Sequence, residues 1–307
     1  MSIALITHAA CELHDMGRGH PECAERLRAI EQQLKASGVD KLVTRYEAPT
    51  VTREQLLRVH TEDYVQSVFD ASPQRGYRYF DDDTVLNPHT LPAALHAAGA
   101  LVLAVDLVMQ NQVNSAFCSV RPPGHHATRS RGTGFCFFNN VAVGVAHAMQ
   151  MYGLERVAIA DFDVHHGNGT EDIFQHDERV LLCSTFQHPF YPYCGADTRS
   201  THVVNVPLPA MSNGAAMREA VNHYWLPAMQ AFKPQLIFCS AGFDAHADDD
   251  MSRLLWQDED YAWVTTAIKT VATEFCNGRV ISTLEGGYDL PSLGRSVVAH
   301  IRRLGEL

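Results

Sequence analysis

Short apolar runs recur along the chain and alternate with longer segments of helical periodicity. The runs occupy residues 3–6, 42–46, 116–120, 157–160, 180–184, 203–206, 236–240 and 280–284. Because each run is continuously apolar rather than alternating, it is typical of a strand that is buried on both faces of a parallel sheet. Helical spacing marks residues 21–37, 91–110, 141–152, 215–232 and 258–276.

This pattern predicts a single α/β domain over residues 1–307. An eight-stranded, mostly parallel sheet with helices on both faces would account for all of the apolar runs. No linker, internal repeat or low-complexity tract divides the series into two units. The longer segments at 70–90, 121–135, 186–202 and 244–257 are expected to form loops of the functional surface.

Composition narrows the function and the compartment. The formal net charge of -11 argues against a protein that binds nucleic acid through a basic face, and it favours a cationic substrate. The eight cysteines form no C-x-x-C pair, which favours buried free thiols in a reducing compartment over a disulfide framework or a zinc knuckle. No signal peptide and no apolar run of membrane-spanning length is evident, so we expect a cytoplasmic protein that does not bind membranes.

Residues suited to metal binding or acid–base chemistry follow four of the apolar runs. The four segments are Arg121-Pro-Pro-Gly-His-His126, Asp161-Phe-Asp-Val-His-His166, Ala241-Gly-Phe-Asp244 and Glu285-Gly-Gly-Tyr288. One polar residue after a strand is usually a helix cap, whereas four such strand ends indicate a site. Ligands of open parallel sheets bind beyond the carboxyl ends of the strands, so we expect these segments to meet in one pocket.

The segment that begins at Asp161 indicates a metal. Asp163 and His165 are two residues apart, so on an extended segment both point to the same side and can hold a single ion. Asp161 shares that parity. Asp163, His165 and Asp244 would supply the three protein ligands that a hydrolytic zinc site needs, leaving one position open for water or substrate. Thr170 is a plausible cap for a helix that begins near residue 171.

The tandem histidines would then be free to act on the bound water. Asp161 and Asn168 are available to hold the far ring nitrogens of His125 and His126. Alternatively, the two histidines could themselves be metal ligands. The Pro-Pro-Gly turn before them favours the first interpretation, because such a turn can present both rings to one water molecule more easily than to one ion.

Three aromatic residues allow both a functional and a structural interpretation. Tyr288 follows two glycines, which let a loop approach the pocket closely, and its phenol could donate to a developing oxyanion. Phe135 and Tyr191 could wall an aliphatic channel. For each of them, ordinary core packing is the alternative.

Taken together, these motifs, with Gly134-Phe-Cys-Phe-Phe-Asn-Asn140 and the complete Asp161-Phe-Asp-Val-His-His-Gly-Asn-Gly-Thr170, resemble the zinc-dependent histone deacetylase family. The resemblance covers nearly the whole chain from Gly19-His-Pro-Glu22 onward and is closer to the class II branch and its bacterial relatives than to class I. It implies the arginase/deacetylase fold. It also implies removal of acetyl or other short acyl groups from acyl-lysine side chains of a protein or peptide.

The resemblance assigns roles residue by residue. The implied zinc ligands are Asp163, His165 and Asp244. The implied catalytic residues are His126 as general base and later acid, His125 as its electrostatic partner beside Asp161, Asn168 as the group that orients His126, and Tyr288 as donor to the acyl carbonyl. The implied substrate channel comprises Phe135, Tyr191, Met251, Gly134, His20 and Asp83.

The resemblance also implies one or two structural potassium or sodium ions. The first would lie near Asp161, Asp163, His165, Ser184 and Thr185. The second would lie near Phe174, Asp177, Val180 and His202. Backbone oxygens would supply most of the coordination at the first site.

Substrate class depends on the pocket rim. Met251 lies where the resemblance implies Leu or Met in enzymes that act on acyl-lysine and Glu in those that prefer polyamines. The acidic runs 81–83 and 248–250 could attract cationic substrates of either kind, although such runs are usually only solvated faces.

Three rival functions remain open. The same residues could hydrolyse an acetylpolyamine or another small cationic acyl amide. An arginase-like ureohydrolase would share the fold but would need a further carboxylate where His166 stands, to hold a second manganese ion. The third rival is a non-catalytic module that binds acyl-lysine or zinc, in which loss of His126 or Tyr288 would be expected.

Overall fold

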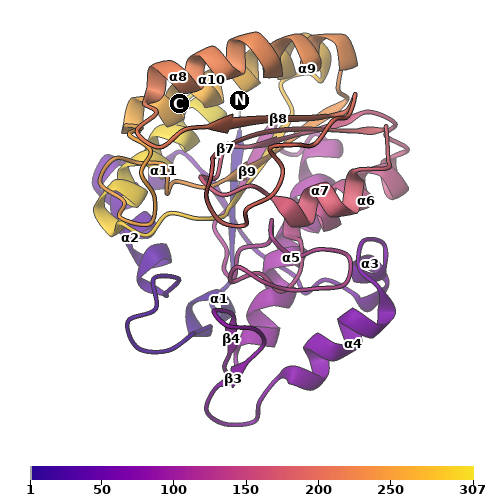
Figure 1. The fold of residues 1–307 in the computed structure, drawn as a ribbon, viewed down its shortest axis with the longest axis vertical. Helices are drawn as coiled ribbons and strands as arrows, with labels where there is room; N and C mark the ends of the chain where they lie inside the picture. Colours follow the sequence, from indigo (N-terminus) through magenta and orange to yellow (C-terminus); the bar gives the residue numbers. More distant parts are fainter. Residues whose placement is uncertain (1) are drawn as a thin grey trace.

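The computed structural model describes residues 2–307 and shows helices on both faces of one large sheet (Figure 1). All eight strands are parallel, in the order β2-β1-β5-β10-β9-β6-β7-β8. They are β1 (Ile3–Thr7), β2 (Thr44–Glu47), β5 (Ser115–Cys118), β6 (Val157–Asp161), β7 (Val180–Gln187), β8 (Val203–Leu208), β9 (Leu236–Ala241) and β10 (Val280–Leu284). The predicted parallel sheet is therefore confirmed, and each apolar run overlaps one of its strands.

The helices form the two outer layers. They are α1 (Ala10–Leu13), α2 (Glu25–Ser37), α3 (Arg53–Leu57), α4 (Glu62–Ala71), α5 (Thr90–Met109), α6 (Asn140–Tyr152), α7 (Asn168–Phe174), α8 (Gly214–Ala220), α9 (Leu226–Phe232), α10 (Asp258–Phe275) and α11 (Leu290–Leu304), with a 3-10 turn at Val39–Lys41. α11 packs between α2 and α10, and α5 packs against α6. A small antiparallel hairpin of β3 (Arg78–Tyr79) and β4 (Val85–Leu86) lies inside the loop expected at 70–90.

Two local details differ from the prediction. The helical segment 215–232 is interrupted by a π-helical turn at Val221–Trp225, just before Pro227, which has no N–H to continue the α-helical hydrogen bonds. Thr170 does not cap a helix, because α7 already begins at Asn168. Instead, the buried Thr170 hydroxyl accepts a hydrogen bond from Asn139 Nδ2 at 3.1 Å.

The longest apolar helix also departs from expectation. α5 is long and apolar enough to cross a membrane by length and composition, although no such run was expected from the sequence. Of its 18-residue apolar window, 67% is buried inside the protein, where α5 packs against α6 and the sheet. Its composition is therefore that of a core helix.

A buried cluster of charges joins the N-terminal segment to the two loops that follow β5 and β10. The Glu22 carboxylate accepts hydrogen bonds from the Arg121 guanidinium and from Arg26 Nη1, the latter at 3.0 Å. His14 Nε2 lies 3.2 Å from the same carboxylate. Burial alone would raise the pKa of Glu22, but Arg121, His14 and Arg26 outweigh it, so the pKa lies well below its ordinary value.

We expect Glu22→Ala to lower the free energy of unfolding by about 3–5 kcal/mol, because it leaves two guanidinium groups buried beside one another without their shared anion. Urea unfolding measures the change. Glu25→Ala, which removes an exposed partner of Arg28, is the control and should cost less than about 1 kcal/mol. Equal losses in the two variants would contradict this account.

Candidate active site

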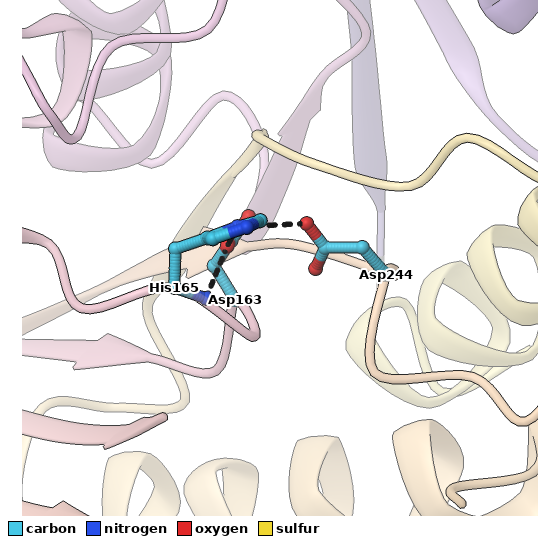
Figure 2. Close-up of side chains that lie close together, drawn as sticks. All are labelled: Asp163, His165 and Asp244. Atoms are coloured by element: carbon cyan, nitrogen blue, oxygen red, sulfur yellow. Dashed lines mark hydrogen bonds and ion pairs between the residues drawn. The ribbon is translucent and has the colours of Figure 1, made fainter. Parts of the chain in front are cut away.

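The three predicted metal ligands lie together at the carboxyl ends of β6 and β9. One ligand atom each from Asp163, His165 and Asp244 lies within 4.8 Å of the other two. Figure 2 shows the His165 ring between the two carboxylates, with Nδ1 3.0 Å from Asp163 Oδ1 and 3.3 Å from Asp244 Oδ2. This mixed set of oxygen and nitrogen donors suits a zinc-type ion.

Backbone groups hold both carboxylates in place. Gly286 N–H donates to Asp163 Oδ2 at 2.8 Å, and Val164 N–H donates to Asp244 Oδ1 at 3.0 Å. Asp244 Oδ2 is buried, and apart from the 3.3 Å contact with His165 Nδ1 it has no hydrogen-bond partner among residues 2–307. A Cβ atom at Gly286 would lie 2.0 Å from that oxygen, so only glycine leaves room for it.

Asp163, His165 and Asp244 form the metal group, and their electrostatics favour a bound cation. Burial alone would lower the pKa of His165, but Asp163 and Asp244 outweigh it and raise the pKa to about 9. Burial and the charge of Asp163 raise the pKa of the Asp244 carboxyl to about 6. The two carboxylates thus favour a positive charge beside them, which a bound cation would supply.

The tandem histidines each use one ring nitrogen for a contact outside the cavity. His125 Nδ1 donates to Asp161 Oδ2 at 3.1 Å, and His126 Nδ1 donates to Asn168 Oδ1 at 2.7 Å. Both rings line the cavity beside the metal group. Their Nδ1 atoms are therefore occupied as the first sequence interpretation expected, and neither ring belongs to the cluster of potential metal ligands.

The surroundings of the two histidines shift their pKa values in opposite directions. Burial alone would lower the pKa of His125, but the carboxylates of Asp163 and Asp161 outweigh it and raise the pKa to about 10. Burial and the neighbouring His125 and His165 hold the pKa of His126 well below its ordinary value. These shifts favour the protonated form of His125 and the neutral, proton-accepting form of His126.

Glu285, for which the sequence predicted no role, supports the turn that carries the two histidines. Its Oε2 accepts hydrogen bonds from Gly124 N–H at 2.7 Å and His125 N–H at 3.1 Å. Burial raises the pKa of the Glu285 carboxyl to about 7. The signal for this residue was its position directly before the Gly-Gly-Tyr sequence, at the end of β10.

A cavity of about 250 Å³ leads to the metal group. Of the predicted channel residues, it is lined by Asp83, Gly134, Phe135, Tyr191 and Met251, and Tyr288 lines it as well. His20 is not in the lining; its ring packs edge-on against Phe135, with ring centroids 4.7 Å apart.

Phe190 is a lining residue that the sequence analysis did not single out. Its ring stacks on the His165 ring at 5.3 Å between centroids, with an interplanar angle of 19°. Tyr191 beside it packs edge-on against His126 at 5.2 Å, and its hydroxyl lies 3.0 Å from Thr133 Oγ1. Consecutive aromatic residues thus cover the metal group and the predicted base.

The two predicted monovalent-cation sites differ in their free oxygens. At the first, Ser184 Oγ and Thr185 Oγ1 are buried without a hydrogen-bond partner among residues 2–307, which fits a bound cation. At the second, the carbonyls of Phe174, Asp177 and His202 already accept backbone hydrogen bonds of 2.9–3.0 Å. Both sites remain predictions.

The acidic runs are mainly structural. Asp248 pairs with Arg295 at 3.2 Å, and the Asp249 side chain is buried and accepts backbone hydrogen bonds. Asp81 Oδ1 accepts from Asp83 N–H and Thr84 N–H. The sequence left both a solvated face and a rim charge open for these runs, and neither interpretation holds for the buried Asp249.

Four neighbouring strands of the sheet carry these motifs, although the motifs are far apart in the sequence. The strands are β5, β10, β9 and β6, in that order. Residues 20–304 match the family described as the histone deacetylase domain. The chain belongs to the histone deacetylase family.

Individual relatives agree with this membership. The chain is 39% identical to the uncharacterized protein slr0245 of Synechocystis over 98% of this chain and 99% of the relative. It is 34% identical to the histone deacetylase-like amidohydrolase of Pseudomonas aeruginosa, over 92% and 77% of the two chains. A crystal structure of the HDA15 HD domain superposes with a TM-score of 0.93 at 34% identity and covers all of this chain and 90% of the other.

These matches confirm the arginase/deacetylase fold and the expected hydrolase activity on amides. Family membership argues against the ureohydrolase alternative. Where that alternative needs another carboxylate, His166 instead pairs with Glu171 at 2.9 Å. The geometry of the site supports the roles of individual residues, which stay predictions.

We expect Asp244→Ala to lose most bound metal and at least about 10²-fold in turnover while keeping its fold, because the apolar core forms without the ion. Metal content by plasma mass spectrometry, turnover of an acetylated peptide and circular dichroism measure the three effects. Asp106→Ala, which removes a carboxylate that bonds His147 and Tyr152 outside the cavity, is the control. Full metal occupancy in Asp244→Ala would show that the assignment is wrong.

Proposed function

We propose that the protein is a zinc-dependent deacetylase that removes acetyl or other short acyl groups from lysine side chains of proteins or peptides. The observation that carries this proposal is an aromatic-walled cavity whose inner end holds Asp163 and His165 beside two imidazoles and a phenol. Such a cavity suits a long aliphatic side chain that ends in an amide.

Asp163, His165 and Asp244 would hold the ion. The buried Asp244 Oδ2, whose one polar contact is with His165 Nδ1 at 3.3 Å, fits a cation at that place. When bound, zinc supplies Lewis acidity to the acyl carbonyl and acidifies a water molecule. A structural potassium or sodium ion at Ser184 and Thr185 is part of the same proposal.

His126 is the proposed proton carrier. Its Nδ1 donates to Asn168, so a neutral ring has its lone pair on Nε2 and can take a proton from the attacking water there. The same nitrogen then delivers the proton to the leaving lysine amine. His125, held by Asp161, supplies fixed positive charge beside this reaction.

Tyr288 is the proposed donor to the carbonyl oxygen. The residue lines the cavity on the side of the loop that follows β10. As the amide carbon becomes tetrahedral, negative charge grows on its oxygen, and a phenol O–H placed there stabilises that charge more than it stabilises the ground state.

Met251 favours acyl-lysine over an acetylpolyamine as the substrate. The thioether lines the cavity and can pack on the lysine methylenes, but it offers no charge to the second ammonium of a polyamine. The polyamine remains the alternative substrate for the same catalytic set. We also propose a cytoplasmic location, from the composition and cysteine usage of the chain.

We expect Tyr288→Phe to lower kcat by about 10²–10³-fold, because it removes one oxyanion donor and keeps the ring. Steady-state kinetics on an acetyl-lysine peptide and a thermal melt measure the effect. Tyr64→Phe is the matched control, since the buried Tyr64 hydroxyl bonds the Phe137 carbonyl away from the cavity. It should change Tm and leave kcat intact. A Tyr288→Phe enzyme that melts early but keeps its kcat would show that Tyr288 is a packing residue.

The substrate assignment predicts a kcat/KM at least ~10-fold higher for an acetyl-lysine peptide than for acetylspermidine, which corresponds to about 1.4 kcal/mol in transition-state binding. Met251→Glu should shift the ratio toward the polyamine, because a carboxylate at the rim can pair with its distal ammonium. Rates of the wild type and the variant on both substrates test this. A wild-type preference for acetylspermidine would move the function to polyamine deacetylation.

A further inference from the structure

Asp249 is a buried carboxylate without an assigned role. It lies in the loop between β9 and α10 and is 4% exposed. Its Oδ2 accepts hydrogen bonds from Tyr288 N–H at 2.6 Å and Asp289 N–H at 3.1 Å, and its Oδ1 accepts from Met251 N–H at 3.0 Å. One side chain therefore holds two segments that are far apart in the sequence.

Both segments contribute to the same cavity. Met251 and Tyr288 line it, and the proposed function places the lysine stem against the first and the acyl oxygen against the second. The two loops also meet directly, where Phe243 N–H donates to the Gly286 carbonyl at 3.0 Å, but Asp249 is the side chain whose carboxylate bonds the backbone of both Met251 and Tyr288.

The Tyr288 loop needs such a restraint. Gly287 has a φ of +118°, in the region that glycine adopts far more readily than other residues, and it precedes Tyr288 directly. On the other side of this hinge, Arg26 Nε donates to the Gly287 carbonyl at 2.6 Å, and the Arg26 guanidinium carbon lies 4.9 Å from the centre of the Tyr288 ring. Arg26 thus holds the carbonyl and the ring face, whereas the Tyr288 and Asp289 N–H groups are held by Asp249.

We propose that Asp249 is a positioning residue that orients the Tyr288 phenol relative to Met251. This inference rests on the proposed function. If the carboxylate is replaced, the N–H groups of Tyr288 and Asp289 lose their shared acceptor, and the glycine hinge lets the phenol leave the place where the oxyanion forms. The effect falls on the transition state, so it reduces kcat more than it changes KM.

The variant that tests this is Asp249→Asn, which keeps the size of the side chain and one acceptor oxygen. We expect kcat on an acetyl-lysine peptide to fall about 10–100-fold, with KM within about threefold of the wild type. In a Tyr288→Phe background the same substitution should cost less than about threefold, because the hydroxyl that Asp249 positions is already gone.

Asp260→Asn is the matched control. Asp260 is also 4% exposed and accepts a backbone hydrogen bond, from Gln257 N–H at 2.8 Å, but it does not line the cavity. Its replacement should lower Tm without a selective loss of kcat. A purely structural role of Asp249 would give the same result in Asp249→Asn.

Hydrogen–deuterium exchange gives a readout that does not depend on activity. In Asp249→Asn, an NH2 group replaces one of the two acceptor oxygens, so the amides that it faces, those of Tyr288 and Asp289 or that of Met251, should exchange faster, whereas Gly286, which bonds Asp163, keeps its protection.

The outcomes separate the two proposals. Equal losses from Asp249→Asn in the wild-type and Tyr288→Phe backgrounds, or unchanged exchange of these amides, overturn the role of Asp249 alone. An unimpaired Tyr288→Phe enzyme overturns the proposed oxyanion donor, and the exchange data still decide whether Asp249 holds the two segments.

Discussion

The site depends on two like charges that are kept out of water beside one imidazole. Asp163 and Asp244 come from the ends of adjacent strands, so the pairing of β6 with β9 brings them together, and their repulsion in a buried place costs free energy unless a positive group lies between them. The other contacts of the site follow from this constraint. Backbone N–H groups bond three of the four carboxylate oxygens, and only Asp244 Oδ2 has no backbone donor among residues 2–307.

The sheet itself was predictable because burial on both faces gives each strand a continuous apolar run. Such a run can be recognised in the sequence without knowing which strand pairs with it. The convergence of the four motifs was predictable because the carboxyl ends of parallel strands lie on one edge. The order of the strands was not. Nothing local in the sequence places residues 280–284 between β5 and β9, since that order depends on how distant helices pack.

Two of the residues whose roles were not predicted from the sequence share one kind of contact. Glu285 and Asp249 each bond pairs of backbone N–H groups, and such partners carry no mark in the sequence. Asp249 was therefore grouped with an acidic surface run and Glu285 was given no role, whereas both serve as acceptors inside the protein. Phe190 was missed for a related reason, because its neighbour Tyr191 is equally aromatic and only the loop geometry separates their roles.

Arg26 bonds the carbonyl of Gly287, 261 positions later in the chain, and the guanidinium reaches the Tyr288 ring from the N-terminal segment. A ribosome therefore has to release almost the whole chain before the pocket can be completed. Contacts of such long sequence separation form late and slow the folding reaction. Until then, the nascent polypeptide holds the candidate metal ligands without the loop that completes the pocket, so activity requires synthesis through at least Tyr288.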